Sequence, residues 1–123
     1  MPYITPAQRD ELLTRPSATP GELNYTITLE LLRPSPDESA IMQMIMVYLA
    51  GKKPSYELYN SVMGVLECAY REYQHRMGRL ALYQRAEVIQ AVQTSLYDDV
   101  IYPFEVGKRH ENGDVYPHGT IRQ

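Results

Sequence analysis

SYELYNSVMGVLECAYREYQHRMGRLALYQRAEVIQAVQTSLYDDVI, residues 55–101, is the stretch of sequence that decides the fold. Its apolar residues recur at spacings of three and four, which is the period of one buried face of an α-helix. We therefore predict one long helix over about 56–101, with Ser55 as its N-cap. Unbroken, this helix would contain about 46 residues and would be about 70 Å long. The apolar stripe consists of Tyr59, Val62, Leu66, Ala69, Tyr73, Met77, Leu80, Ala86, Ile89, Val92, Leu96 and Val100.

Gly78 is the weakest point of the predicted long helix. Glycine inside a helix costs about 1 kcal/mol relative to alanine. The apolar stripe nevertheless keeps its phase across this residue, so we expect a continuous helix and keep a break at Gly78 as the alternative. Pro103 predicts a kink after the helix, and an irregular, extended tail is expected over 111–123.

Three further helices are predicted upstream, each from the same starting signal. A hydroxyl stands at the N-cap, a proline at the first helical position and Gln or Glu at the third. The signal occurs at 5–8, 19–22 and 35–38, where Thr5, Thr19 and Ser35 are the predicted caps. Since no stretch alternates like a β-strand, the predicted fold is all-α. It is a small helical bundle over 1–110 with one long C-terminal helix, followed by the tail.

The apolar surface of these helices predicts an interface. Short helices can cover only part of so long a helix, so we expect the rest of its stripe to pack against a second copy of the chain. Eleven of the twelve aromatic residues are tyrosine, a residue that favours half-wet contact surfaces. Plain core packing is the alternative. The candidate interface residues are Met42, Met44, Met46, Tyr48, Tyr59, Tyr73 and Met77.

Charge and composition exclude several classes of function. The net charge of −3 argues against general binding of polyanions. The single cysteine, Cys68, fits a reducing compartment. The longest apolar stretch, 41–50, is shorter than a membrane span, and no export signal follows Met1, so we expect a cytoplasmic protein without a membrane partner.

Two other functions are alternatives to the simpler interpretation that the polar residues form an ordinary solvent-exposed helix face. A nucleotide or nucleic acid could bind an arginine and tyrosine face formed by Arg71, His75, Arg76, Arg79 and Tyr83. A metal-dependent hydrolase could use Glu72 with His75, which match the Glu-x-x-His pattern, or His110, Asp114 and His118. The first pattern occurs once, whereas a di-metal bundle needs it twice. We therefore predict no catalytic residue, no metal site and no cofactor.

Four motifs carry a resemblance: MPYI at 1–4, PGELNY at 20–25, GVLEC at 64–68 and ENGDVY at 111–116. The chain resembles an uncharacterised family of short proteins found among phages and bacteria. The resemblance implies a phage or prokaryotic accessory protein of unknown activity, and it carries over no catalytic residue. Together with the apolar helical surface, it leads us to expect a non-enzymatic, oligomeric interaction protein in the host cytoplasm or the virion, acting as an assembly component or host-factor binder. It marks six motif positions: Glu22, Asn24, Tyr25, Asn112, Asp114 and Tyr116. We expect the cluster at 24–25 to hydrogen-bond to the cluster at 112–116 and so pin the tail, with ligand binding as the alternative.

Overall fold

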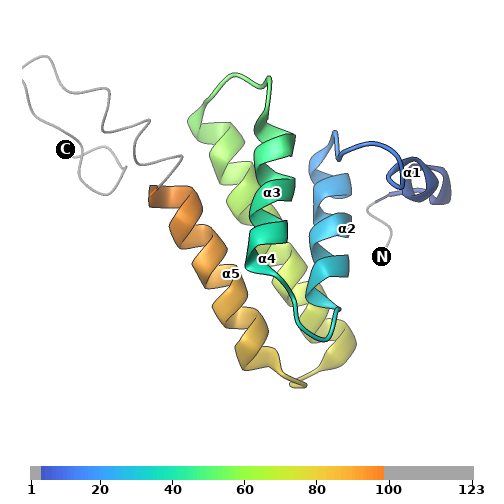
Figure 1. Cartoon of the computed structure of the whole chain (residues 1–123), viewed down its shortest axis with the longest axis vertical. Coiled ribbons are helices and arrows are strands. Elements are labelled where there is room, and N and C mark those ends of the chain that lie inside the picture. The colour runs from blue at the N-terminus through green and yellow to red at the C-terminus, as the bar shows by residue number, and fades with distance from the viewer. Residues whose placement is uncertain (1–3, 99–123) are drawn as a thin grey trace, which may run out of the picture.

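The computed structural model describes residues 4–98, and the described part consists of helices joined by turns and loops, without a β-strand (Figure 1). The prediction of an all-α bundle is therefore confirmed. The predicted kink at Pro103, the tail over 111–123 and the domain boundary at 110 lie outside the described residues. No helix in the described part has an apolar stretch long enough to cross a bilayer. The helices are α1 (Pro6–Glu11), α2 (Pro20–Leu31), α3 (Glu38–Leu49), α4 (Tyr56–Met77) and α5 (Leu82–Leu96).

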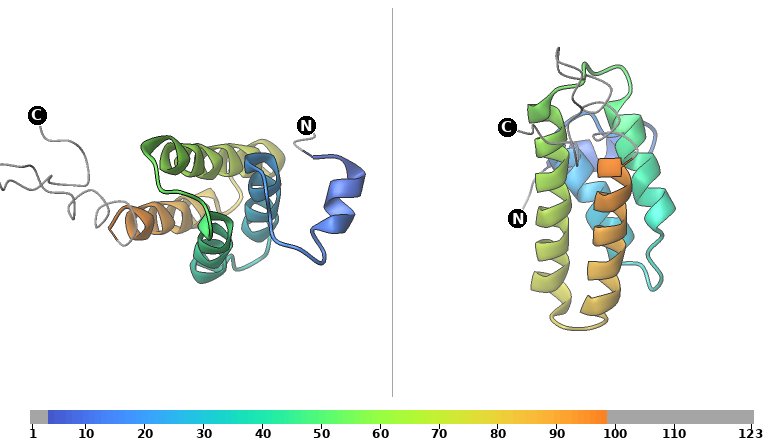
Figure 2. Two further views of the ribbon diagram at one scale, coloured as in Figure 1. Left: turned by 90° about the horizontal axis from the view of Figure 1, so that it is seen from above. Right: turned by 90° about the vertical axis from the view of Figure 1, so that its left-hand side faces the viewer.

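The four longer helices form one bundle in which α2 packs on α3 and α4, and α5 packs on the same two helices. In Figure 1, α2 and α4 run in one direction and α3 and α5 in the other. The connection from α3 to α4 crosses the end of the bundle, as the view from above in Figure 2 shows. As a result α2 and α4 are parallel neighbours, and α1 stands outside the bundle next to α2.

The predicted continuous helix over 56–101 is wrong, because the chain reverses at Gly78. Helix α4 ends at Met77, Gly78 has φ 64° and ψ −128°, and α5 begins at Leu82. That backbone conformation is the mirror image of the extended region and is open to glycine but not to residues with a side chain. The right-hand view of Figure 2 shows α4 and α5 side by side, joined by this turn.

The hairpin explains why the apolar stripe continues in phase across the break. Two helices that are each apolar on one face bury those faces against each other when the chain folds back. Tyr59, Val62 and Leu66 of α4 thus share one core with Ile89 and Val92 of α5. Most of the stripe that was expected to need a second chain is covered by the same chain. That core is completed by Leu23, Ile27 and Leu31 of α2 and Ile41, Ile45 and Tyr48 of α3.

The predicted helix starts are confirmed at three caps and corrected at one. The full capping box forms at Thr5, and the hydroxyls of Thr19 and Ser55 each accept from an amide of the first turn. The third predicted helix begins at Glu38, with Asp37 rather than Ser35 as its N-cap. The reason lies outside the motif: Glu30 Oε2 accepts from the Asp37 amide at 2.8 Å, and Asp37 is extended.

Candidate interaction surface at the α4–α5 turn

The turn between α4 and α5 lies at one end of the bundle (Figure 1). The large apolar side chains in and beside this turn are exposed. Met77 is 38% exposed, Leu80 63% and Tyr83 76%, and Arg79 between them is exposed as well. We refer to Met77, Arg79, Leu80 and Tyr83 together as the tip. Large apolar side chains that gather on a surface are typical of binding sites, whereas isolated ones are ordinary.

The backbone of this turn is strained. Ala81 lies in the left-handed region with φ 48° and ψ 33°, and it caps α5 without a side-chain hydrogen bond. It is the one residue other than glycine with positive φ among residues 4–98. The left-handed region costs an L-residue about 1–2 kcal/mol. Such strain persists only where surrounding contacts enforce it, and it is common at functional sites.

Two buried side chains, Tyr73 and Arg85, enforce the conformation of the turn. Tyr73 Oη donates a hydrogen bond of 2.6 Å to the carbonyl oxygen of Leu80. The guanidinium of Arg85 lies 4.7 Å from the centre of the Tyr73 ring. Its Nε donates to the carbonyl of Leu31 at 2.9 Å, and its Nη2 donates to the carbonyl of Arg33.

Arg85 therefore joins the start of α5 to the C-terminal end of α2. The last carbonyls of a helix have no partner within the helix and carry partial negative charge, so a cation is favourable there. The tip thus sits on a turn that two helices hold in place. Local sequence patterns give no sign of this role, because the carbonyls that Arg85 binds lie 54 and 52 positions earlier in the chain.

The predicted arginine and tyrosine face is distributed over both helices of the hairpin. Arg71, His75 and Arg76 are exposed on α4, Arg79 lies in the turn, and Tyr83 lies on α5. Arg76 Nε is 2.8 Å from a carboxylate oxygen of Glu72. Neither Arg71 nor Arg79 has a salt bridge within the described part of the chain. A hydrogen bond to the neighbouring Glu87 carboxylate raises the pKa of the Tyr83 hydroxyl above its usual value.

The predicted interface residues divide between the core and the surface. Tyr48, Tyr59 and Tyr73 are buried within the chain, so their rings pack against its own helices. Met42 and Met44 are half-buried and pack against the core. Met46 and Met77 are exposed.

The motif residue Glu22 forms a buried polar cluster that ties α1 to α2. Both carboxylate oxygens accept from the Arg15 guanidinium at 2.8 Å. Gln8 Nε2 donates to it at 3.0 Å and the Ala18 amide at 2.8 Å. The hydrogen bonds from Arg15 and Ala18 lower the pKa of Glu22 from 4.5 to about 2. The cluster is structural, since the observed donors occupy the carboxylate.

The other motif positions are only partly described. Asn24 is buried, and its Oδ1 accepts from Thr28 Oγ1 at 3.1 Å, whereas Tyr25 is half-buried. The expected partners in the tail are not among the described residues, and the pinning of the tail stays a prediction. These partners are Asn112, Asp114 and Tyr116.

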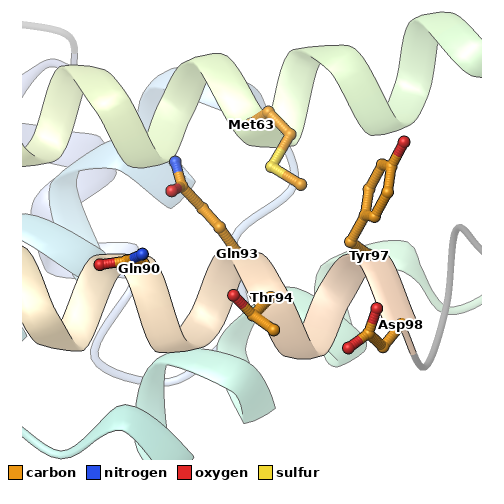
Figure 3. A pocket seen from close by; sticks show the side chains of 6 residues that line it. All are labelled: Met63, Gln90, Gln93, Thr94, Tyr97 and Asp98. Carbon is orange, nitrogen blue, oxygen red and sulfur yellow. The ribbon is translucent and has the colours of Figure 1, made fainter. Parts of the chain in front are cut away.

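Two open hollows of about 400 and 440 Å³ flank the outer face of α5. In the first, Met63 of α4 faces Gln90, Gln93 and Thr94 of α5 (Figure 3). Apart from Asp98, its lining is uncharged and offers amides and hydroxyls. Neither hollow includes a residue of the tip.

Metal-ligating side chains are not gathered in the part of the chain that is described. Within residues 4–98 no three His, Cys, Asp or Glu side chains are placed to hold a metal ion. Glu72 is ion-paired with Arg76, and His75 and Cys68 are exposed on α4. The other predicted ligands, His110, Asp114 and His118, lie outside the described residues.

The comparisons with known proteins give a family but no activity. The chain belongs to a family described as Domain of unknown function (DUF6899), whose model matches residues 1–115. The matched region therefore includes all of the described bundle and extends past its last helix. No curated protein and no solved structure matches the chain.

Proposed function

We propose that the protein is a non-enzymatic interaction protein that docks another protein on the tip. The observation that carries the proposal is the combination of three exposed apolar side chains with a strained turn that buried contacts hold in place. The motif resemblance to phage and bacterial proteins favours a virion or assembly component, or a binder of a host factor. The proposed location is the host cytoplasm or the virion.

The chemistry of the tip suits a binding hot spot. Tyr, Met and Arg are enriched in protein interfaces, and Tyr and Arg dominate the binding energy in many of them. A turn that is already ordered loses little conformational freedom on binding, so more of the contact energy appears as affinity. The hydrogen bond from Tyr73 to Leu80 and the contacts of Arg85 supply that order.

Capture followed by titration tests this proposal. Tagged wild-type protein is used to capture partners from bacterial lysate, and each captured protein is purified and titrated against wild type and variants. The double variant Leu80→Ser with Tyr83→Ser changes two exposed residues, so the bundle should fold unchanged. Loss of two hot-spot side chains should weaken binding by about 100-fold or more.

The matched control is Gln90→Ser with Thr94→Ser, which changes two residues on the outer face of α5 away from the tip. It should bind like wild type. Equal affinity of the tip variant and wild type for every purified partner would refute docking at the tip.

A second copy of the chain stays a proposed partner. With α4 and α5 paired, the remaining exposed apolar residues include Met46 and Val47 on α3 as well as the tip. Light scattering over a range of concentrations measures self-association. A dimer that Met46→Gln abolishes and the tip variant leaves intact would place the contact between copies on α3.

Binding of a nucleotide or nucleic acid is the second candidate, because Arg71 and Arg79 have no carboxylate partner in the described region. It predicts salt-sensitive binding of a fluorescein-labelled oligonucleotide or a labelled nucleotide. The double change Arg76→Ala with Arg79→Ala should reduce this binding. Binding that is unaffected by the double change would exclude this face as the site.

A further inference from the structure

We infer that two copies of the chain pair through the outer surface of α3, with the two α3 helices antiparallel about a two-fold axis. The inference rests on the proposed second copy as a partner, and it names the surface, the orientation and the charges of that contact. Docking of another protein on the tip does not depend on it.

The outer surface of α3 is an uncharged stripe that faces solvent. Exposed residues recur along it at the spacing of one helix face, and we call them the α3 face: Ser39, Gln43, Met46, Val47 and Ala50. Met46 is 44% exposed and Val47 43%. No residue from 39 to 51 carries a charge. Because the solvent side of a helix normally carries charged side chains, this stripe suits contact with protein better than contact with water.

Charges of opposite sign stand at the two ends of the α3 face. Two carboxylates precede it and two ammonium groups follow it, all exposed: Asp37, Glu38, Lys52 and Lys53. Asp37 already caps the helix, and Lys52 Nζ donates to the carbonyl of Tyr48 at 2.7 Å. Glu38 and Lys53 have no ion pair within residues 4–98. These two charges are therefore available to a partner.

The neighbouring charges keep the start of the α3 face negative. Glu87 of α5 lines the same hollow as Glu38 and adds a further carboxylate. Arg33 pairs with Glu30 of α2. Arg85 is buried, and its guanidinium bonds to backbone carbonyls of the same chain. Neither arginine is thus left to pair with Glu38.

The charges of α4 lie on the other side of the bundle. Helices α2 and α5 both pack between α3 and α4, so α4 is diagonally across from α3. Arg71, Arg76 and Glu57 belong to α4, and Arg79 lies in the turn that follows it. Asp98 lines the hollow between α4 and α5. The ends of the α3 face therefore take their signs from the residues that flank α3.

A second copy in antiparallel orientation matches this pattern of charge. The two-fold axis places the start of each α3 beside the end of the other, so each Glu38 meets Lys53 of the other copy. A parallel pair would instead set Glu38 against Glu38 and Lys53 against Lys53. Unlike charges attract at both ends in the antiparallel pair, and between them only uncharged residues meet. The α3 face is thus complementary to itself.

The size of the α3 face sets the strength of the dimer. Helix α3 has 12 residues and is about 18 Å long. A contact of one such helix with its copy is at or below the lower limit of stable interfaces, about 1,200 Å² in total. We therefore expect a dimer that exchanges with monomer and has a Kd on the order of 10 μM or weaker.

The antiparallel arrangement also places the tips. The tip lies at the end of the bundle where α3 begins (Figure 1). Two copies that pair head to tail along α3 therefore present their tips at opposite ends of the dimer. Such a dimer can hold two partner molecules at once.

Charge reversal followed by mixing tests the pairing. Glu38→Lys and Lys53→Glu each replace attraction by repulsion at both Glu38–Lys53 contacts. In analytical ultracentrifugation at low salt, each variant alone should dimerise about tenfold or more weakly than wild type. An equimolar mixture of the two variants should dimerise as tightly as wild type, because opposite charges meet again at both ends of the mixed dimer.

Matched controls separate the contact from general effects of charge. Asp10→Lys and Arg9→Glu reverse one charge each at exposed positions of α1, outside the bundle. Alone or mixed, they should dimerise like wild type. Met46→Gln with Val47→Gln should weaken the dimer by removing apolar contact. Thermal unfolding should show that every variant folds.

Three results would overturn the inference. They are a wild type that stays monomeric up to about 1 mM, charge variants that each dimerise as tightly as wild type, and a mixture that dimerises no better than its components. A dimer that only Leu80→Ser with Tyr83→Ser abolishes would assign the contact to the tip instead. A monomeric wild type that binds a purified partner through Leu80 and Tyr83 would keep the proposed function and refute the dimer.

Discussion

Replacement of Gly78 by alanine should destabilise the hairpin and favour exchange of α5 between two chains. Gly78 has φ 64° and ψ −128°, and a Cβ built at this position meets no atom within 4 Å. Its effect is therefore confined to the backbone. This region is essentially restricted to glycine, and holding a residue with a side chain in such a region costs about 1–3 kcal/mol. Glycine in turn costs about 1 kcal/mol more than alanine in a helix.

The two effects act in the same direction. Gly78→Ala should shift the balance between the hairpin and a continuous α4–α5 helix by about 2–4 kcal/mol per chain, which is about 30-fold to 1,000-fold. A continuous helix exposes the apolar surfaces of α3 and α4 that α5 now covers, and α5 of a second copy can cover them. Exchange of an identical element is a known consequence of changes in hinge loops.

The assay is size-exclusion chromatography with light scattering, combined with thermal unfolding. We expect a larger dimer fraction than in wild type at equal concentration and a less stable monomer. The matched control is Gly64→Ala within α4, where a Cβ also meets no atom within 4 Å. It should stabilise the protein by about 0.5–1 kcal/mol without changing its oligomeric state. A Gly78→Ala protein with the stability and mass of wild type would refute the strain argument.

Three further predictions concern the polar contacts. The pKa of Glu22 falls from 4.5 to about 2 on folding, so its contribution to stability is present above pH 4.5 and lost as the pH falls toward 2. Urea unfolding at several pH values should show this loss in wild type and not in Glu22→Gln. Arg85→Lys should lower the free energy of unfolding by about 2 kcal/mol. The planar guanidinium donates to the carbonyls of Leu31 and Arg33 at the same time, and a lysine ammonium cannot reproduce that pair of donors. Tyr73→Phe should cost about 1 kcal/mol in chemical unfolding by removing the hydrogen bond to Leu80.

The sequence predicted those features whose causes lie within a few residues. The hydroxyl caps at Thr5, Thr19 and Ser55 act on amides three residues away, and all three form. The start of α3 was misplaced because Glu30, on the preceding helix, binds the Asp37 amide. That contact depends on the path of the chain between α2 and α3, which local patterns do not specify.

The break at Gly78 shows a different limit of sequence reasoning. A continuous helix and a helical hairpin present the same apolar spacing, so periodicity cannot distinguish them. The distinction depends on whether α5 finds a surface to cover, and Arg85 helps to fix that surface through carbonyls 54 and 52 residues earlier in the chain. The same contact makes Arg85 a buried structural residue.

The composition of the turn is what connects this fold to the proposed function. Glycine at position 81 would remove the left-handed strain of Ala81, and polar residues at 80 and 83 would remove exposed apolar surface. Neither change would disturb the core, since Leu80 and Tyr83 lie outside it. The hairpin thus has a strained backbone at Ala81 and exposed apolar side chains at Leu80 and Tyr83, although neither feature is needed to join α4 to α5. A bound partner gives both a physical reason, because it would cover the apolar side chains and use the rigidity that the strained turn provides.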